Sequence, residues 1–434
     1  MGEAGHATSD RERRIRGVII ALTIIVLAIA TAAAARKFAR DQSALLRWRG
    51  QLLDLPRGID IYEPAAYPDI PPYPNPPFAG LLLWPFAKLP PLAGAMALYT
   101  LKAALAGLAI AWAIRLAAAG RRWSVDAALP AAAMGLVLLL CARPVLSDLQ
   151  HGNINIIVLF LVMAGLTLLA RGRDFGAGVV IGLAAAVKVT PGLFGLYFLC
   201  KRQWRAAAGM FAGGLIGVAA PMPVLGIVHT IDLHVAWFDQ IVRPYAMETD
   251  LEYTGHMNQS LPGVFFRLFT DSPGVDRGDE LGAESINIAS LDPVVAKGIV
   301  AGLIAALLVT LAWLCRLRAF PSTDRDWRLA CEWSLALIVM LLISERSWKH
   351  HYVIMALPFA VMVAHLWLGA PPRWPRRALW GAIGLALVVM LGMSGETIGW
   401  VYHGVGHKYV EAMGSYFWMA VTSIVAIAMI LRQK

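Results

Sequence analysis

The sequence predicts an all-α integral membrane protein, a bundle of about ten to twelve transmembrane helices with interfacial helices in its first outer loop. Its composition indicates this class. The apolar fraction is 58%, the charged fraction is 15% and the mean hydropathy is +0.62, whereas soluble domains are about half apolar and about a quarter charged. The 434 residues are therefore to be divided into membrane spans rather than soluble domains.

A transmembrane helix needs about 20 mainly apolar residues. Candidate spans occur at 16–35, 92–118, 126–143, 154–170, 205–228, 294–315, 329–343, 352–369, 377–395 and 414–431. The stretch 175–200 is long enough for one span, but Lys188 and Pro191 interrupt it, and proline stops or bends a helix. This stretch is either one span or a re-entrant helix pair. A re-entrant pair would keep the basic residues at both of its ends on the same, cytoplasmic side of the membrane.

Basic residues between the apolar runs set the predicted orientation. A net charge of +10 would suggest nucleic-acid binding in a soluble protein, but here many cations lie in short loops, where they favour the cytoplasmic side. We therefore expect no nucleic-acid partner. The predicted layout is a cytoplasmic tail at 1–15, one transmembrane domain at 16–431 in the plasma (inner) membrane, and a cytoplasmic tail at 432–434. The cations assigned to the cytoplasm include Arg121, Arg122 and Lys201.

This layout places segments 36–91 and 229–293 outside, as the first and the large outer loop. Most of the acidic residues and histidines then lie on the outer face. A structural protein has no need to gather ionisable side chains on one face, so this asymmetry predicts an outward-facing active site. Within the first loop, 41–55 has apolar residues at helical spacing and 78–90 is bounded by prolines. Both are predicted to be interfacial helices.

Asp41 follows the outer end of the first apolar run, where a carboxylate can reach the headgroup layer. As a general base it would accept a proton from an attacking hydroxyl group. The alternative is a helix N-cap or a solvated charge, a common position for aspartate.

Two further segments carry cationic groups. Lys188 interrupts an apolar run, and a lysine at membrane depth usually faces a polar cavity or partner; the alternative is snorkelling to the interface. Residues 344–351, SERSWKHH, combine Arg346, Trp348, His350 and His351 in one short loop. These side chains donate hydrogen bonds and suit an anion such as phosphate. Two adjacent histidines do not complete a tetrahedral zinc site.

Amide side chains lie in two of the predicted outer segments, Asn153 and Asn155 in one and Asn258 and Gln259 in the other. Amides suit sugar hydroxyls because they both donate and accept hydrogen bonds, but they also cap helices. No phosphate-binding P-loop, dinucleotide fingerprint, zinc-protease motif or nucleophile elbow stands in a convincing context. The sequence thus gives no support to a nucleotide-driven pump, a zinc protease or a serine hydrolase.

The order of these motifs resembles glycosyltransferase family 87, polyprenyl-phosphate-sugar-dependent membrane enzymes of the GT-C fold. The resemblance extends over about residues 36–370. It rests on Asp41, Gly58–Tyr62 (GIDIY), Tyr73–Pro77 (YPNPP), Gln150–Asn155 (QHGNIN), Gly182–Pro191 (GLAAAVKVTP), Asn258–Ser260 (NQS) and Ser347–His351 (SWKHH). One departure is Gln42, because the family often has an aromatic residue after the acidic one.

The resemblance implies transfer of a sugar, a hexose such as mannose or a pentose, from a polyprenyl-phosphate donor to a lipid or glycan acceptor on the outer face. Asp41 would be the base for an inverting attack, and fixed cations would stabilise the leaving phosphate, so neither a metal nor a cofactor is expected. The donor phosphate would be bound by Lys188, His350, His351, Arg47 and Arg346. The sugar and acceptor would be bound by Asn153, Asn155, Asn258, Gln259, Trp348 and Tyr62.

Two other functions compete with this reading. A lipid or sugar transporter or flippase also uses broken helices, as at Lys188 and Pro191, but usually shows internal repeats and charges at the membrane midplane. The sequence has no evident repeat. A non-catalytic assembly partner would not need a carboxylate, a lysine and paired histidines on one face.

Overall fold

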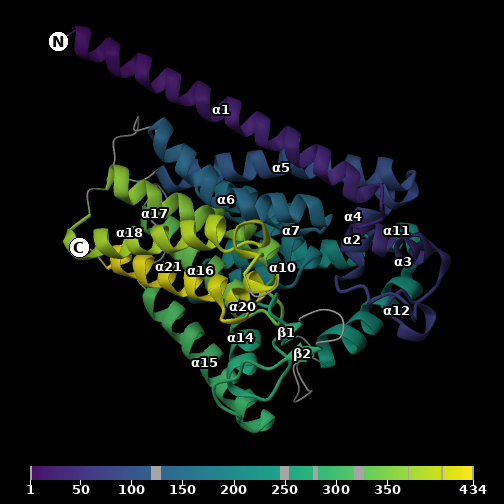
Figure 1. The fold of residues 1–434 in the computed structure, drawn as a ribbon. Coiled ribbons are helices and arrows are strands. Elements are labelled where there is room, and N and C mark those ends of the chain that lie inside the picture. The colour runs from purple at the N-terminus through teal and green to yellow at the C-terminus, as the bar shows by residue number, and fades with distance from the viewer. Residues whose placement is uncertain are drawn as a thin grey trace.

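The computed structural model describes residues 2–118, 129–244, 254–276, 282–316, 327–369, 371–401 and 404–432, and in these it is almost entirely helical (Figure 1). The α-helices are α1 Gly2–Phe38, α2 Ala44–Arg47, α3 Arg49–Asp54, α4 Pro77–Lys88, α5 Pro91–Ala118, α6 Ala131–His151, α7 Asn155–Leu169, α8 Asp174–Val187, α9 Leu193–Cys200, α10 Trp204–Ala219, α11 Met222–Leu225, α12 Ile227–Trp237, α14 Leu261–Phe269, α15 Pro293–Leu314, α16 Trp327–Leu342, α17 Ala356–Leu368, α18 Arg373–Leu387, α19 Gly395–Ile398, α20 Gly406–Ala412 and α21 Ser415–Leu431.

Shorter elements connect these helices. Single turns of 3-10 helix lie at Leu55–Arg57, Pro64–Ala66 and Thr190–Gly192, a longer one at Lys349–Met355, and π-helical turns at Phe238–Val242 and Val388–Gly392. The strands β1 Val275–Asp276 and β2 Ala283–Glu284 form one antiparallel pair. The predicted all-α class is confirmed.

Seven helices in the described part of the chain are long and apolar enough to cross a membrane, or eight if the bent pair α20–α21 forms one span. This is fewer than the ten to twelve that the sequence predicts. The difference arises partly because α7, α8 and the Thr190–Cys200 segment are apolar but shorter than a full span. Hydropathy alone does not show where a helix ends within an apolar run.

The ambiguous stretch 175–200 is a pair of short helices that reverses direction at Lys188. Helices α8 and α10 pack in parallel, because Gly178 lies against Ala206 and Gly217 against Ala186. The intervening α9 must therefore carry the chain back. The contact between α8 and α10 is so close that a Cβ at Gly178 would lie 2.0 Å from the carbonyl oxygen of Ala206. Such small-residue contacts are typical of membrane helices.

The same reasoning fixes the direction of α1 and α6. In the N-terminal third of α1, Glu12 Oε2 accepts a hydrogen bond of 3.0 Å from the amide of Ala131, the first residue of α6, and just beyond the C-terminal ends of the two helices Ser43 lies against Gly152. The two helices are therefore parallel, and Asp41 lies at the end of the bundle that also carries His151. We call this end, with Asn155, Lys188 and the 344–351 loop, the site end.

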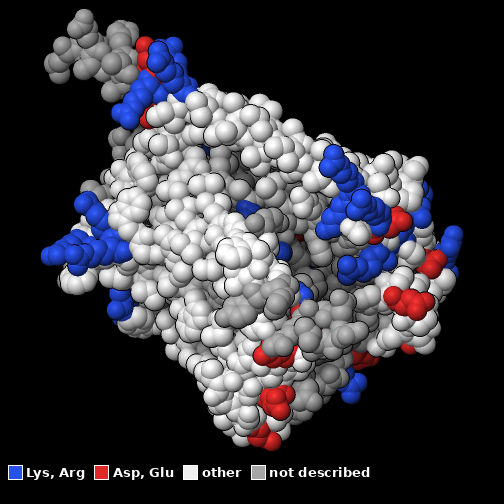
Figure 2. Space-filling view, in the orientation of Figure 1, with Lys and Arg blue, Asp and Glu red and all other residues white. Residues whose placement is uncertain are grey.

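Charged groups are unevenly distributed over the surface. In Figure 2 the middle of the bundle shows mainly uncharged residues, basic side chains cover the start of α1 and the region of α2, and acidic side chains gather below, around α14 and α15. Basic side chains therefore lie at both ends of α1, and the predicted orientation of the bundle stays a prediction. The predicted basic loop at Arg121 and Arg122 lies outside the described residues.

Lys201, assigned from the sequence to the cytoplasmic side, is buried in the structure. It is 4% exposed, and its Nζ lies 2.8 Å from Glu332 Oε2 and donates to the Cys315 carbonyl oxygen at 2.8 Å. Tyr197 also donates to Glu332 at 2.7 Å. This buried group joins α9 to α16 at the end of the bundle opposite the site end.

The predicted interfacial helix 41–55 is two short helices, α2 and α3, which meet at Trp48. Its apolar face packs against protein, with Leu45, Leu52 and Leu55 each at most 1% exposed. Trp48 meets Tyr73 at 5.4 Å between ring centroids, edge to face. The second predicted helix, 78–90, corresponds to α4 and contributes to the same packing.

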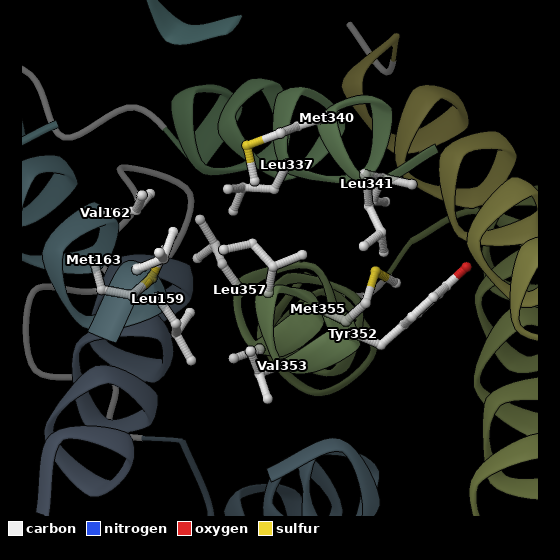
Figure 3. Close-up of a cluster of buried hydrophobic side chains, with 14 of the residues drawn as sticks. Leu159, Val162, Met163, Leu337, Met340, Leu341, Tyr352, Val353, Met355 and Leu357 are labelled. Carbon is white, nitrogen blue, oxygen red and sulfur yellow. The ribbon is translucent and has the colours of Figure 1, made fainter. Parts of the chain in front are cut away.

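The core beneath the site end is formed by α7, α16 and α17. Figure 3 shows Leu159 and Met163 of α7 facing Leu357 of α17, with Leu337 and Met340 of α16 closing the other side. These side chains are at most 4% exposed. Close packing of this kind holds the loop between α16 and α17 in a defined position.

Candidate active site

The 344–351 loop brings two histidines against the end of α6. The His350 ring stacks on His151 with centroids 4.4 Å apart and planes at 20°. His351 meets His350 edge to face at 4.6 Å, and Trp348 stacks parallel to His351 at 6.5 Å. His350 is 3% exposed. His151 lies within the quoted QHGNIN motif, but the sequence analysis assigns no separate role to it.

The corner between α6 and α7 presents two amides to this ring cluster. Gly152 ends α6 in a left-handed conformation with φ 74°, which glycine adopts without strain. Asn153 Nδ2 then lies 3.4 Å from His350 Nε2, and Asn155 begins α7. Asn155 Oδ1 accepts a hydrogen bond of 2.8 Å from Lys188 Nζ.

A small cavity lies beside these polar groups. It encloses about 30 Å³, enough for ordered water but far less than a sugar. Its polar lining comes from several segments of the chain: Asn155, Lys188, Thr190, Ser344, Ser347 and His351. A donor headgroup must therefore bind over the mouth of this cavity or widen it.

Asp41 ends α1 in a Schellman motif. The Gln42 amide donates to the Lys37 carbonyl oxygen at 3.1 Å and the Asp41 amide to that of Phe38 at 3.0 Å. Asp41 itself has φ 57° and an exposed side chain. The alternative of a helix N-cap is not what the structure shows, because Ser43 caps α2 by accepting from the Leu46 amide.

The cations predicted around the phosphate occupy different positions. Lys188 lies at the cavity, and its charge acts on His350 and His351. Arg47 is exposed at the end of α2, and its charge acts on His151. Arg346 lies 3.2 Å from the Glu345 carboxylate, which offsets its charge.

Three predicted sugar ligands make hydrogen bonds within the protein instead of facing the cavity. Asn258 donates to the Glu345 carbonyl oxygen and accepts from the Ser347 amide. Gln259 donates to the carbonyl oxygens of His256 and Glu411 and accepts from the Tyr416 amide. Tyr62 is fully buried and donates to the Asn75 carbonyl oxygen at 2.7 Å. Their predicted binding role stays untested; their observed role is to hold the loops.

Sequence reasoning missed a buried ion pair beneath the cavity. Lys102 Nζ lies 2.8 Å from Asp148 Oδ2, and both side chains are 0% exposed. Asp148 also accepts a hydrogen bond of 2.8 Å from Asn155 Nδ2. Removing one partner of such a pair destabilises a protein by about 3–5 kcal/mol. The signal was Lys102 itself, since a lysine inside an apolar span needs a partner.

A second group missed from the sequence surrounds Glu411 of α20. The Glu411 carboxylate is 4% exposed and lies 3.9 Å from Lys349 Nζ and 4.0 Å from His256 Nε2. Burial lowers the pKa of His256 to about 4, so its imidazole is neutral at neutral pH.

Arg267 donates to the carbonyl oxygens of Ala412, Thr254, Gly255 and Asn258. Burial lowers the pKa of Arg267 to about 10, which leaves it charged.

Among the described residues, no group of three or more His, Cys, Asp or Glu side chains is arranged to hold a metal ion. The expectation that no metal or cofactor takes part stays a prediction. What the site end presents is an ammonium group, imidazoles and amides beside a cavity, with a carboxylate at the end of α1. Such groups bind anions and polyols.

Comparisons with known proteins identify the family. The family model described as Glycosyltransferase family 87 matches residues 73–345, which include Asn153, Asn155 and Lys188 but neither Asp41 nor His350. A polyprenol-phosphate-mannose-dependent alpha-(1-2)-phosphatidylinositol mannoside mannosyltransferase of Mycolicibacterium smegmatis is 28% identical over 391 residues, 83% of this chain and 76% of its own length.

Two further matches were found. A polyprenol-phosphate-mannose-dependent alpha-(1-2)-phosphatidylinositol pentamannoside mannosyltransferase of the same organism is 29% identical over 336 residues, 74% of this chain and 68% of that protein. The crystal structure of ArnT from Cupriavidus metallidurans in the apo state matches with a TM-score of 0.33 and 16% identity, over 94% of this chain and 76% of that one. This structural similarity is too weak to support a functional argument. The family match alone covers more than half of the sequence, and the chain belongs to glycosyltransferase family 87 as a multi-span membrane glycosyltransferase.

Proposed function

We propose that the protein transfers a mannosyl residue from a polyprenyl-phosphate donor to a hydroxyl group of a lipid or glycan acceptor. The observation that carries this proposal is the convergence of Lys188, His351 and Asn155 at one cavity of the site end. His350 contacts His351, and Asn153 contacts His350, beside that cavity. The family assignment supports sugar transfer, and the relatives' names, which specify polyprenol-phosphate-mannose, support the donor.

The proposed step exchanges one C–O bond for another with inversion at the anomeric carbon. The acceptor oxygen forms a bond to this carbon while the bond to the phosphate oxygen breaks. The electron pair leaves with the polyprenyl phosphate, and the acceptor proton passes to the Asp41 carboxylate. Lys188, with the imidazole N–H groups and Arg47, stabilises the negative charge that develops on the leaving phosphate. Asn153 orients the sugar by hydrogen bonds to its hydroxyl groups.

The direct test is transfer by the purified full-length protein in lipid nanodiscs. We expect radiolabel from polyprenyl-phosphate mannose to appear in a phosphatidylinositol-mannoside acceptor, with no transfer from a nucleotide-linked mannose. Polyprenyl-phosphate arabinofuranose in parallel distinguishes a hexosyl from a pentosyl donor. The protein is a transporter rather than a transferase if two results are obtained together. Neither lipid-linked sugar is transferred to the acceptor, and a labelled polyprenyl-phosphate sugar crosses the bilayer of proteoliposomes that contain the protein.

We also place the site end on the outer face of the plasma membrane, with both termini in the cytoplasm. The basic residues at the opposite end favour this orientation. In a Cys200→Ala background, which removes the exposed cysteine, Glu63→Cys should react with a membrane-impermeant maleimide in intact cells. Arg171→Cys, exposed at the opposite end, should react only after permeabilisation. The reverse pattern would contradict the orientation but not the reaction.

A further inference from the structure

A chain of four polar side chains runs from the interior of the bundle to the cavity. Lys102 comes from α5, Asp148 from the last turn of α6, Asn155 from the start of α7, and Lys188 from the end of α8. Lys102 Nζ lies 2.8 Å from Asp148 Oδ2, Asn155 Nδ2 lies 2.8 Å from Asp148 Oδ1, and Lys188 Nζ lies 2.8 Å from Asn155 Oδ1. The chain thus links a lysine that ligands cannot reach to one that lines the cavity.

The buried end of this chain is electrically neutral. Lys102 also donates to the Asp148 carbonyl oxygen at 2.6 Å, and the Ile156 amide donates to Asp148 Oδ2 at 3.3 Å. Both charged side chains are 0% exposed, so neither is screened by water. Lys102 therefore offsets the Asp148 charge within one compact group, and the remaining attraction of Asp148 for Lys188 acts across Asn155 rather than through an ion pair.

The middle of the chain has a fixed orientation. The Asn155 NH₂ group faces a carboxylate and its oxygen faces an ammonium group, and a flipped amide would place like polar groups together on both sides. Asn155 is 4% exposed, so bulk solvent does not compete for either contact. Asp148 thereby determines which atom Asn155 presents to Lys188.

The outer end of the chain keeps an unneutralised positive charge. Lys188 receives a neutral amide oxygen as its partner, and within the described residues no carboxylate lies within 4.0 Å of its Nζ, so it forms no salt bridge. It lies beside the cavity next to His351 and Ser347. An ammonium group held by a neutral acceptor is positioned to meet an incoming anion without first breaking an ion pair.

We propose that Lys102 and Asp148 are positioning residues for the donor phosphate. Through Asn155 they hold Lys188 at the cavity, and their mutual neutralisation keeps its charge available to the phosphate of the polyprenyl carrier. This inference rests on the proposed function, because it takes Lys188 as the phosphate ligand. According to this inference, the Lys102–Asp148 ion pair affects the affinity for the donor phosphate as well as the stability of the fold.

The test measures binding of sugar-free polyprenyl phosphate to the full-length protein in nanodiscs, together with the melting temperature. Lys102→Met leaves the negative charge of Asp148 without a partner. This charge then attracts Lys188 away from the cavity and repels the anionic polyprenyl phosphate. We expect its Kd to rise about tenfold, the size of one charge-assisted hydrogen bond. Lys102→Met combined with Asp148→Asn removes both charges and should return the Kd to within about twofold of the wild type.

Asn155→Ala provides a second variant in which both charges of the buried ion pair remain, and its melting temperature shows that it is folded. It should also raise the Kd about tenfold. Because the ligand carries no sugar, loss of a sugar contact by Asn155 would leave this Kd unchanged. The matched control is Lys201→Met, which breaks a second buried pair of the described residues, Lys201–Glu332, at 2.8 Å. It should lower the melting temperature without changing the Kd.

Two results would overturn the inference. One is an unchanged Kd in Asn155→Ala or in folded Lys102→Met; the other is a double variant as weak as Lys102→Met, which would mean that the pair is only structural. If the wild-type protein transfers sugar and these variants bind polyprenyl phosphate with the wild-type Kd, the positioning role is wrong and the proposed function stands. A wild-type protein that neither binds polyprenyl phosphate nor transfers from it contradicts the proposed function, and the inference falls with it.

Discussion

Replacing Asp41 by asparagine is expected to lower kcat for mannosyl transfer by about 10²- to 10⁴-fold, the usual contribution of a general base. The variant keeps the shape of the side chain and removes its ability to accept the acceptor proton. Because asparagine tolerates a left-handed backbone as well as aspartate does, the end of α1 at φ 57° should be unaffected. The measurement is steady-state transfer from polyprenyl-phosphate mannose, with the melting temperature recorded in parallel.

Asp41→Gly separates catalysis from folding at the same position. Glycine is the residue that a Schellman motif favours at this point, so the helix end should be as stable or more stable, while transfer is lost. The matched control is Asp69→Asn, another exposed carboxylate of the first loop, which should retain full activity. If Asp41→Asn and Asp41→Gly both transfer mannose at the wild-type rate, Asp41 is not the base.

Lys188→Met is expected to lower kcat/KM by about 10²- to 10³-fold, the usual effect of removing one donor that stabilises developing negative charge. Methionine fills a similar volume but offers the leaving phosphate no charge and no hydrogen bond. Lys188→Arg keeps the charge with a different geometry and should be intermediate, because a guanidinium group does not replace a compact ammonium group at a fixed point. Transfer rates at several donor concentrations provide both parameters.

The control for this position is Lys88→Met, which removes an exposed cation from the end of α4. It should change neither kcat nor KM by more than about twofold, since exposed charges are screened by solvent. Loss of activity in Lys88→Met equal to that in Lys188→Met would show a general effect of surface charge. Normal kcat/KM in Lys188→Met would remove Lys188 from the phosphate site.

The sequence led to several parts of the site because their signals are local. A lysine inside LAAAVKVTP or two histidines after SERSWK are recognisable without any knowledge of their neighbours. The re-entrant reversal at Lys188 was one of two readings, and the parallel packing of α8 and α10 decides between them. The apolar face of 41–55 was also recognised, but the sequence did not show what covers it; in the structure Leu45 and Leu52 pack within the protein.

Other parts depended on partners that lie far apart in the chain. Asn258 and Gln259 have the chemistry of sugar ligands, but the structure shows their amides bonded to neighbouring backbone groups and Gln259 to the α20–α21 corner. Lys201 was recognised from the sequence only as a cation of a cytoplasmic segment, whereas in the structure it is paired with Glu332, 131 residues away. A side chain's hydrogen-bonding capacity can be read from its type, whereas the groups that use that capacity are set by packing.

By itself the sequence determined the membrane class, the approximate position of most helices, the family resemblance and the segments that carry ionisable groups. These follow from hydropathy and from motif order along the chain. Only the tertiary structure decided that Asp148 lies beside Lys102, 46 residues away, and that Asn155 separates this pair from Lys188. The physical reason is that a buried charge must be neutralised by whatever group the fold brings within about 3 Å. Hydropathy along the chain does not specify that group.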